Sequence, residues 1–230
     1  MKRSLLFALW FVALGFGSSA AQGVVVDQGR FVVRVAEREV GEEEFVIRRA
    51  GLGSGDAIFA SGVVTRSVGT GTQEVRPLLR ATPLEGTAES YQVSVSGHEP
   101  AEIRLVRSGR RYVATIRTSA GDEDREFQAL PATYVLELDV AHHYYFLRSL
   151  REGRQGHVLV PRTREQLNIA ASPAVTEDLR LGPNVVSARR VVFTMEDGDT
   201  RVVWFDRQGR VLRVEIPARR YVAERLDLVG

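Results

Sequence analysis

The chain has 230 residues, of which 44% are hydrophobic and 26% charged, and it contains no cysteine. This composition is typical of a folded globular protein and excludes a disordered chain, a collagen and a disulfide-rich scaffold. A chain of this length buries enough surface to fold as one large all-β domain without a metal or a disulfide.

The first 21 residues have the three-part pattern of a secretory signal peptide. Lys2 and Arg3 precede an apolar stretch over 5–16, and small residues follow as far as Ala21. The apolar stretch is shorter than the roughly 20 residues that span a bilayer. We therefore expect cleavage after Ala21, no transmembrane span, and a single domain, 22–230, in the periplasm or outside the cell.

Charge and cysteine content limit the possible partners. The 31 basic residues include the two of the leader, so cleavage leaves them equal in number to the 29 acidic residues. Nucleic-acid binding needs an excess of basic groups, and nucleic acid is not expected as a partner. Without cysteine the chain cannot carry an N-terminal lipid anchor, so the mature protein is expected not to be a lipoprotein.

The N-terminal half alternates hydrophobic and polar residues in short runs, as antiparallel strands do. Phe31, Val33 and Val35 lie on one side of the first predicted strand, a turn is expected near 38–41, and Phe45 opens the return strand. The same alternation predicts six further strands along the chain: 57–66, 73–80, 91–96, 103–107, 112–118 and 157–160.

The C-terminal part predicts a three-stranded meander. Strands are expected over 189–195, 201–205 and 210–216, with turns at 196–199 and 206–209. In the last strand the hydrophobic residues share one side and the charged residues the other, so one face of this sheet is expected to be buried.

One segment, about 140–151, breaks the alternation. Hydrophobic residues recur there at spacings of four and three: Val140, Tyr144, Leu147 and Leu150. This spacing is typical of an amphipathic helix, with Asp139 as its cap and Gly153 as its end, after a short extended lead-in over 134–138. We predict a mainly β fold: one strongly curved antiparallel sheet, or half-open β-barrel, with one covering helix.

No motif identifies a reaction or a metal site. Ser54 lies in a glycine-rich loop that lacks the context of a nucleophile elbow, and the paired carboxylates lie at expected turns. No histidine has the spacing of a metal ligand set, whether among His98, His142, His143 or His157. We predict no catalytic residue, no metal and no cofactor.

The aromatic residues suggest where a ligand would bind. Tyr144, Tyr145 and Phe146 cover more than half of the helix circumference, and Trp204 and Phe205 are adjacent in a strand, so their rings point to opposite faces. One interpretation is that all of them pack in the core. The other is that some line an apolar cavity between sheet and helix, and it predicts a ligand site formed by Trp204, Phe193, Tyr144 and Leu147.

Both ends of the chain and the helical passage carry a family resemblance. The segments are the strand 31–35, its return strand 44–47, the passage 138–148, and the strand pair 203–215 with an Asp-x-x-Gly turn. They resemble an uncharacterised family of exported bacterial β-rich proteins, similar to the LolA and LolB type of lipoprotein carrier. The resemblance implies a curved sheet with helix over its concave side and a hydrophobic-ligand pocket in the envelope. It implies no catalytic residue.

The sequence thus favours an exported, non-enzymatic protein of the bacterial cell envelope that binds a lipid-like or other hydrophobic ligand. The alternative is an envelope assembly or interaction protein without a small-molecule ligand. Such a protein would bind an envelope partner through strand edges or through an arginine-rich face: Arg104, Arg107, Arg110 and Arg111. A hydrolase without a recognisable motif is the third hypothesis.

Overall fold

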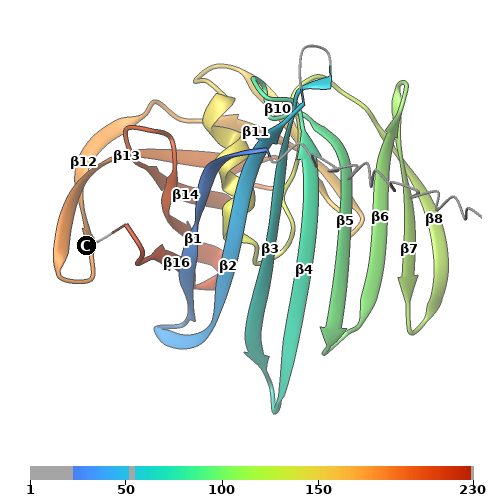
Figure 1. Cartoon of the computed structure of the whole chain (residues 1–230), viewed down its shortest axis with the longest axis horizontal. Coiled ribbons are helices and arrows are strands. Elements are labelled where there is room, and N and C mark those ends of the chain that lie inside the picture. Colours follow the sequence, from blue (N-terminus) through green and yellow to red (C-terminus); the bar gives the residue numbers. More distant parts are fainter. Residues whose placement is uncertain (1–22, 52–54, 229–230) are drawn as a thin grey trace, which may run out of the picture.

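The structure is a computed structural model that describes residues 23–51 and 55–228 (Figure 1). Its first half is a continuous antiparallel meander in which each strand pairs with the next. The eight strands are β1 (Val24–Val35), β2 (Arg38–Ala50), β3 (Ala57–Val68), β4 (Gly71–Ala81), β5 (Ala88–Gly97), β6 (Ala101–Ser108), β7 (Arg111–Thr118) and β8 (Gly121–Gln128).

The second half adds two 3-10 helices and eight strands to the other side of β1. In chain order these elements are β9 (Thr133–Val135), the 3-10 helix η2 (Ala141–Ser149), β10 (Gln155–Val160), β11 (Glu165–Ala171), β12 (Val175–Leu181), β13 (Asn184–Met195), β14 (Thr200–Phe205), β15 (Val211–Ile216), the short 3-10 helix η3 (Pro217–Arg219) and β16 (Tyr221–Arg225). The last strand, β16, pairs with β1 and so joins the two halves into one sheet.

The sheet is open and curved rather than closed. Within the described residues its order runs from β8 at one end, through β1 and β16 in the middle, to β9 at the other end. Pairing is antiparallel except between β9 and β10. The hairpin of β12 and β13 projects as an arm at the left of Figure 1. The predicted fold class, a mainly β protein with one curved sheet and one covering helix, is confirmed.

Side-chain alternation explains which face of the sheet is buried. On β2, Glu43, Phe45 and Ile47 point inward, while the neighbouring Glu42 and Glu44 are exposed. Inward residues of the other strands behave in the same way and form one large hydrophobic cluster with η2. Glu43 is a charged residue at a position where the pattern puts a hydrophobic one, and it marks the start of a buried polar network.

Most of the predicted strands are confirmed, including the C-terminal meander of β13, β14 and β15. The first turn is different: it comprises Ala36 and Glu37, both with positive φ, and 38–41 already belong to β2. The amide of Ala36 donates a hydrogen bond to the carbonyl of Arg220, which fixes this turn although it has no glycine, asparagine or aspartate. The predicted signal peptide lies outside the described residues. In the part of the chain that is described, no helix combines the length and the apolar character needed to cross a membrane.

Candidate functional site

The helix η2 fills the inside of the curved sheet, where it packs against β3, β9 and β15. Its residues from Ala141 to Leu147 are all buried. The prediction of a helix here is confirmed, but it is a 3-10 helix and it covers 141–149 rather than 140–151. Ionisable side chains gather at its N-terminal end, and a groove opens at its C-terminal end.

Glu43 of β2, not Asp139, caps the N-terminal end. Its carboxylate accepts hydrogen bonds from the backbone N–H groups of Ala141 at 2.6 Å and His142 at 2.8 Å. The ring of His142 adds a third contact, with Nδ1 2.7 Å from Oε1 of Glu43. The predicted cap is therefore wrong: Asp139 has φ of 62° and lies between Arg66 and Arg219 instead.

Glu137 is the centre of a second buried group. Its carboxylate accepts hydrogen bonds from the hydroxyl of Tyr91 at 3.0 Å and from Nε of Arg162 at 2.6 Å. Burial raises the pKa of Glu137, although the Arg162 guanidinium acts against this. The backbone N–H of Glu137 donates to Nδ1 of His143, and burial holds the pKa of that histidine well below its usual range.

This network links η2 to the surrounding strands inside the sheet. The side chains of Glu43, Glu137 and His142 are fully buried, and both acids have several hydrogen-bond donors. The nearest cavity, beside Glu137 and Tyr144, holds about 30 Å³, enough for one or two water molecules. No group of three His, Cys, Asp or Glu residues suited to a metal ion occurs within 23–51 and 55–228.

A groove of about 750 Å³ opens at the C-terminal end of η2. We call it the η2 groove and define it by six of its lining residues: Leu84, Pro131, Tyr134, Arg148, Leu150 and Arg154. One wall is the loop 82–87 between β4 and β5, and the opposite wall is the end of η2 with the chain that leads to β10. Its volume lies within the roughly 300–1,000 Å³ of small-molecule sites.

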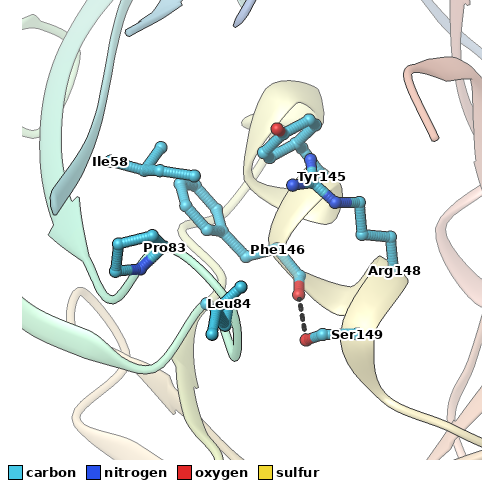
Figure 2. Close-up of a pocket in the computed structure, with 8 residues that line it drawn as sticks. Ile58, Pro83, Leu84, Tyr145, Phe146, Arg148 and Ser149 are labelled. Carbon is cyan, nitrogen blue, oxygen red and sulfur yellow. Dashed lines mark hydrogen bonds between the residues drawn. The ribbon is translucent and has the colours of Figure 1, made fainter. Parts of the chain in front are cut away.

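A small pocket of about 10 Å³ adjoins the groove and shares Leu84, Arg148 and Ser149 with it. Figure 2 shows the ring of Phe146 pointing from the helix towards Ile58 and Pro83, so the floor of this end is apolar. The loop is held to the helix because the Ser149 hydroxyl lies within hydrogen-bond distance of the carbonyl oxygens of Glu85 and Phe146.

Arg148 differs from the other residues of the groove. Its guanidinium stacks on the ring of Tyr145, with Cζ 3.5 Å from the ring centre, as Figure 2 shows. Among the described residues it has no ion-pair partner, and its buried Nη1 has no hydrogen-bond partner. Burial lowers the pKa of Arg148 to about 10, so the side chain is still charged at neutral pH.

The four predicted ligand residues do not lie together. Phe193, Tyr144 and Leu147 are buried in the large cluster around η2. Trp204 belongs to a separate cluster with residues of β12 and β13, and its Nε1–H donates to Glu177 at 2.8 Å. The prediction that adjacent Trp204 and Phe205 point to opposite faces holds, because Phe205 is in the large cluster.

The groove residues are not identified from the sequence. Leu84 follows a proline in a short loop, where an isolated hydrophobic residue carries no periodic signal. Arg148 follows a hydrophobic run of the helix and has the pattern of an ordinary basic residue in a last turn. The one local signal of the groove is the spacing of three residues between Arg148, Arg151 and Arg154. It indicates a groove only once the loop 82–87 is known to lie opposite these arginines.

No protein-family model matches this chain, and no curated protein matches it. Among solved structures it is similar to a β-barrel-like protein of the domain of unknown function DUF1849 from Brucella abortus. The TM-score is 0.56 at 6% identity, and the match covers 90% of this chain and 98% of that one. A DUF1089 family protein from Pseudomonas aeruginosa has a TM-score of 0.43 at 13% identity, with 77% and 90% of the two chains covered.

The likeness to the Brucella protein concerns the fold alone, because the identity is so low. It agrees with the expected uncharacterised, β-rich group of proteins with a barrel-like sheet. Neither structure is described as a LolA- or LolB-type carrier. The resemblance to LolA- and LolB-type carriers therefore stays a prediction.

Proposed function

We propose that the protein is an exported, non-enzymatic protein of the bacterial cell envelope that binds a lipid-like or other hydrophobic ligand in the η2 groove. The observation that carries this proposal is the exposed side chain of Leu84, at 87% exposure, on the rim of a groove of about 750 Å³. Pro131 is exposed on the other side, and the largely buried Tyr134 and Leu150 also line the groove.

The filled interior of the sheet supports a ligand site in the groove rather than under the helix. The cavities beside η2 hold about 10 and 30 Å³, far less than a lipid chain needs. Tyr144, Leu147 and Phe193 are each exposed by 5% or less, so they are core residues. The proposed ligand site is therefore the groove at the C-terminal end of η2, and not the concave face of the sheet beneath the helix.

Substitution of Leu84 tests the proposal. Leu84→Ser removes an exposed side chain and leaves the core intact, so the folded state should be unaffected. Burying a leucine under a ligand contributes about 1.5–3 kcal/mol, and its loss should weaken binding of the fluorescent hydrophobic probe N-phenylnaphthylamine about 10-fold or more. The readout is the dissociation constant from a fluorescence titration.

Val113→Ser on β7 is the matched control, because Val113 is also a partly exposed hydrophobic residue but lies away from the groove. This variant should bind the probe as the wild type does. Equal weakening by both substitutions would show that the probe binds exposed hydrophobic surface in general, and would contradict the groove as the site.

One observation favours the assembly or interaction role as a second candidate. In the described chain β12 pairs with β13 alone, so its other edge has backbone groups available to a further strand. The arm also exposes Val175 at 46% and Val185 at 55%. If the wild type takes up no hydrophobic probe, this arm becomes the favoured functional surface, since edge strands pair readily with partner chains.

A further inference from the structure

Two arginines of this protein have opposite surroundings. Arg225 is fully buried, and its guanidinium contacts Asp27 at 2.9 Å and Asp227 at 3.0 Å. Arg148 stacks on Tyr145, but no carboxylate lies within ion-pair distance of it in the described residues. Arg148 is half-buried, and its Nη1 is buried without a hydrogen-bond partner among the described residues. Burying a charged donor without an acceptor is unfavourable, so the surroundings of Arg148 are incomplete.

Arg148 is not explained as a cap of the helix. A basic residue in the last turn commonly interacts with the free carbonyl groups there. The carbonyl of Leu147 instead accepts from the amide of Leu150, and the carbonyl of Phe146 lies 3.0 Å from the hydroxyl of Ser149. The guanidinium points back over the ring of Tyr145, one turn earlier, as Figure 2 shows.

The charge of the groove also lacks compensation. Arg151 and Arg154 line it together with Arg148, and Glu85 is the acidic residue that faces them. Arg151 and Arg154 are exposed and pair with no acid within the described residues. The groove therefore joins an apolar rim, formed by Leu84 and its neighbours, to a positively charged end.

We propose that the ligand of the η2 groove is a long-chain amphiphile with an anionic headgroup, of the fatty-acid class, and that Arg148 binds its carboxylate. The inference rests on the proposed function and specifies its ligand. The acyl chain lies against Leu84, Pro131 and Leu150. The planar guanidinium, already oriented by Tyr145, donates paired hydrogen bonds to the two carboxylate oxygens, a geometry that arginine and carboxylate share.

A pair of probes that differ only in charge tests this inference: cis-parinaric acid and its methyl ester, titrated by fluorescence at pH 8. The wild type should bind the acid about 10-fold more tightly than the ester, since a charge-assisted hydrogen bond contributes roughly that factor or more. Arg148→Gln should remove this preference by weakening the acid about 10-fold while leaving the ester unchanged.

Folding of the variant is checked in the same experiment. Replacing an unpaired, half-buried charge by a neutral side chain should leave the thermal midpoint equal or higher. Arg180→Gln on β12 is the matched control, because Arg180 is exposed on the hairpin of β12 and β13 and does not line the groove. It should keep the preference of the wild type for the acid.

The outcomes separate this inference from the proposed function. Equal binding of acid and ester by the wild type would overturn the anionic headgroup and leave a hydrophobic-ligand protein. A preference for the acid that survives in Arg148→Gln would overturn Arg148 as the anchor. Binding of neither probe by the wild type would contradict the proposed function itself.

Discussion

At the scale of single residues, buried charges fix the position of the helix inside the sheet. Glu43 occupies an inward position of β2, and it satisfies two backbone N–H groups that begin η2. The first N–H groups of any helix lack partners within it, and a carboxylate there also interacts favourably with the helix dipole. One residue of the N-terminal meander thereby positions an element almost a hundred residues later.

Removing that carboxylate should be strongly destabilising. Glu43→Gln keeps the size of the side chain but replaces one acceptor oxygen with an NH₂ group facing backbone donors. We expect the free energy of unfolding to fall by about 3 kcal/mol, as when one partner of a buried charged group is lost. Urea unfolding of the variant and of the wild type measures this loss of free energy.

Glu42→Gln is the control for this experiment, because Glu42 is the preceding residue and forms an exposed pair with Arg30. Its effect should be below about 0.5 kcal/mol. Similar losses in the two variants would mean that Glu43 does not hold the helix.

His143 gives the protein a pH dependence. Burial, with a smaller contribution from His142, lowers its pKa well below 6.5, so the ring is neutral in the folded state. The unfolded chain binds a proton there as the pH falls below about 6.5. Stability therefore decreases with falling pH, by up to about 1.4 kcal/mol per pH unit from this group.

The substitution His143→Gln should remove this contribution. Urea unfolding at pH 7 and at pH 5 should show a smaller loss of stability in the variant than in the wild type. Glu137, whose pKa is raised by burial, acts in the opposite direction, but it is present in both proteins. His98→Gln, which changes an exposed histidine, should behave as the wild type, and an unchanged loss in His143→Gln would contradict the assignment.

At the scale of elements, the sequence predicts the existence of η2 but not its type or its cap. In a 3-10 helix residues three apart lie above one another, and this brings Arg148 over Tyr145. Spacings of three and four fit both helix types, so periodicity alone does not separate them. The cap comes from Glu43, and a tertiary contact of that kind leaves no local signal.

Two of the strands that sequence reasoning misses, β8 and β16, lack the half-buried alternation for different reasons. On β8 the one buried residue is Phe127, and the rest of Gly121–Gln128 is charged or polar, so no alternation is visible. On β16, Ala223, Glu224 and Arg225 are all buried because β16 lies between β1 and β15. Edge strands and central strands both depart from the half-buried pattern on which the prediction relies.

At the scale of the whole molecule, the sheet curves so far that β8, at one end of the strand order, approaches β11, towards the other end. The two strands do not pair with each other within the described residues. Side chains join them there. The amide of Gln166 on β11 accepts from the backbone N–H of Gln128 at 3.1 Å and donates to its carbonyl at 2.8 Å. Arg164 and Glu123 form an ion pair beside it. This arrangement explains how a barrel-like outline arises from an open sheet.

The contact between Gln166 and Gln128 should therefore hold β8 in place. Gln166→Ala removes two hydrogen bonds, each contributing about 1 kcal/mol, so amide hydrogen exchange in 121–128 should become roughly 5-fold faster or more. Exchange in β1 to β4 should stay as in the wild type, because these strands lie in the interior of the sheet.

Gln92→Ala on β5 is the control, because it changes an exposed glutamine that takes no part in this contact, and it should leave β8 unaffected. Faster exchange throughout the chain in Gln166→Ala would mean that the side-chain contact supports the whole sheet rather than its edge.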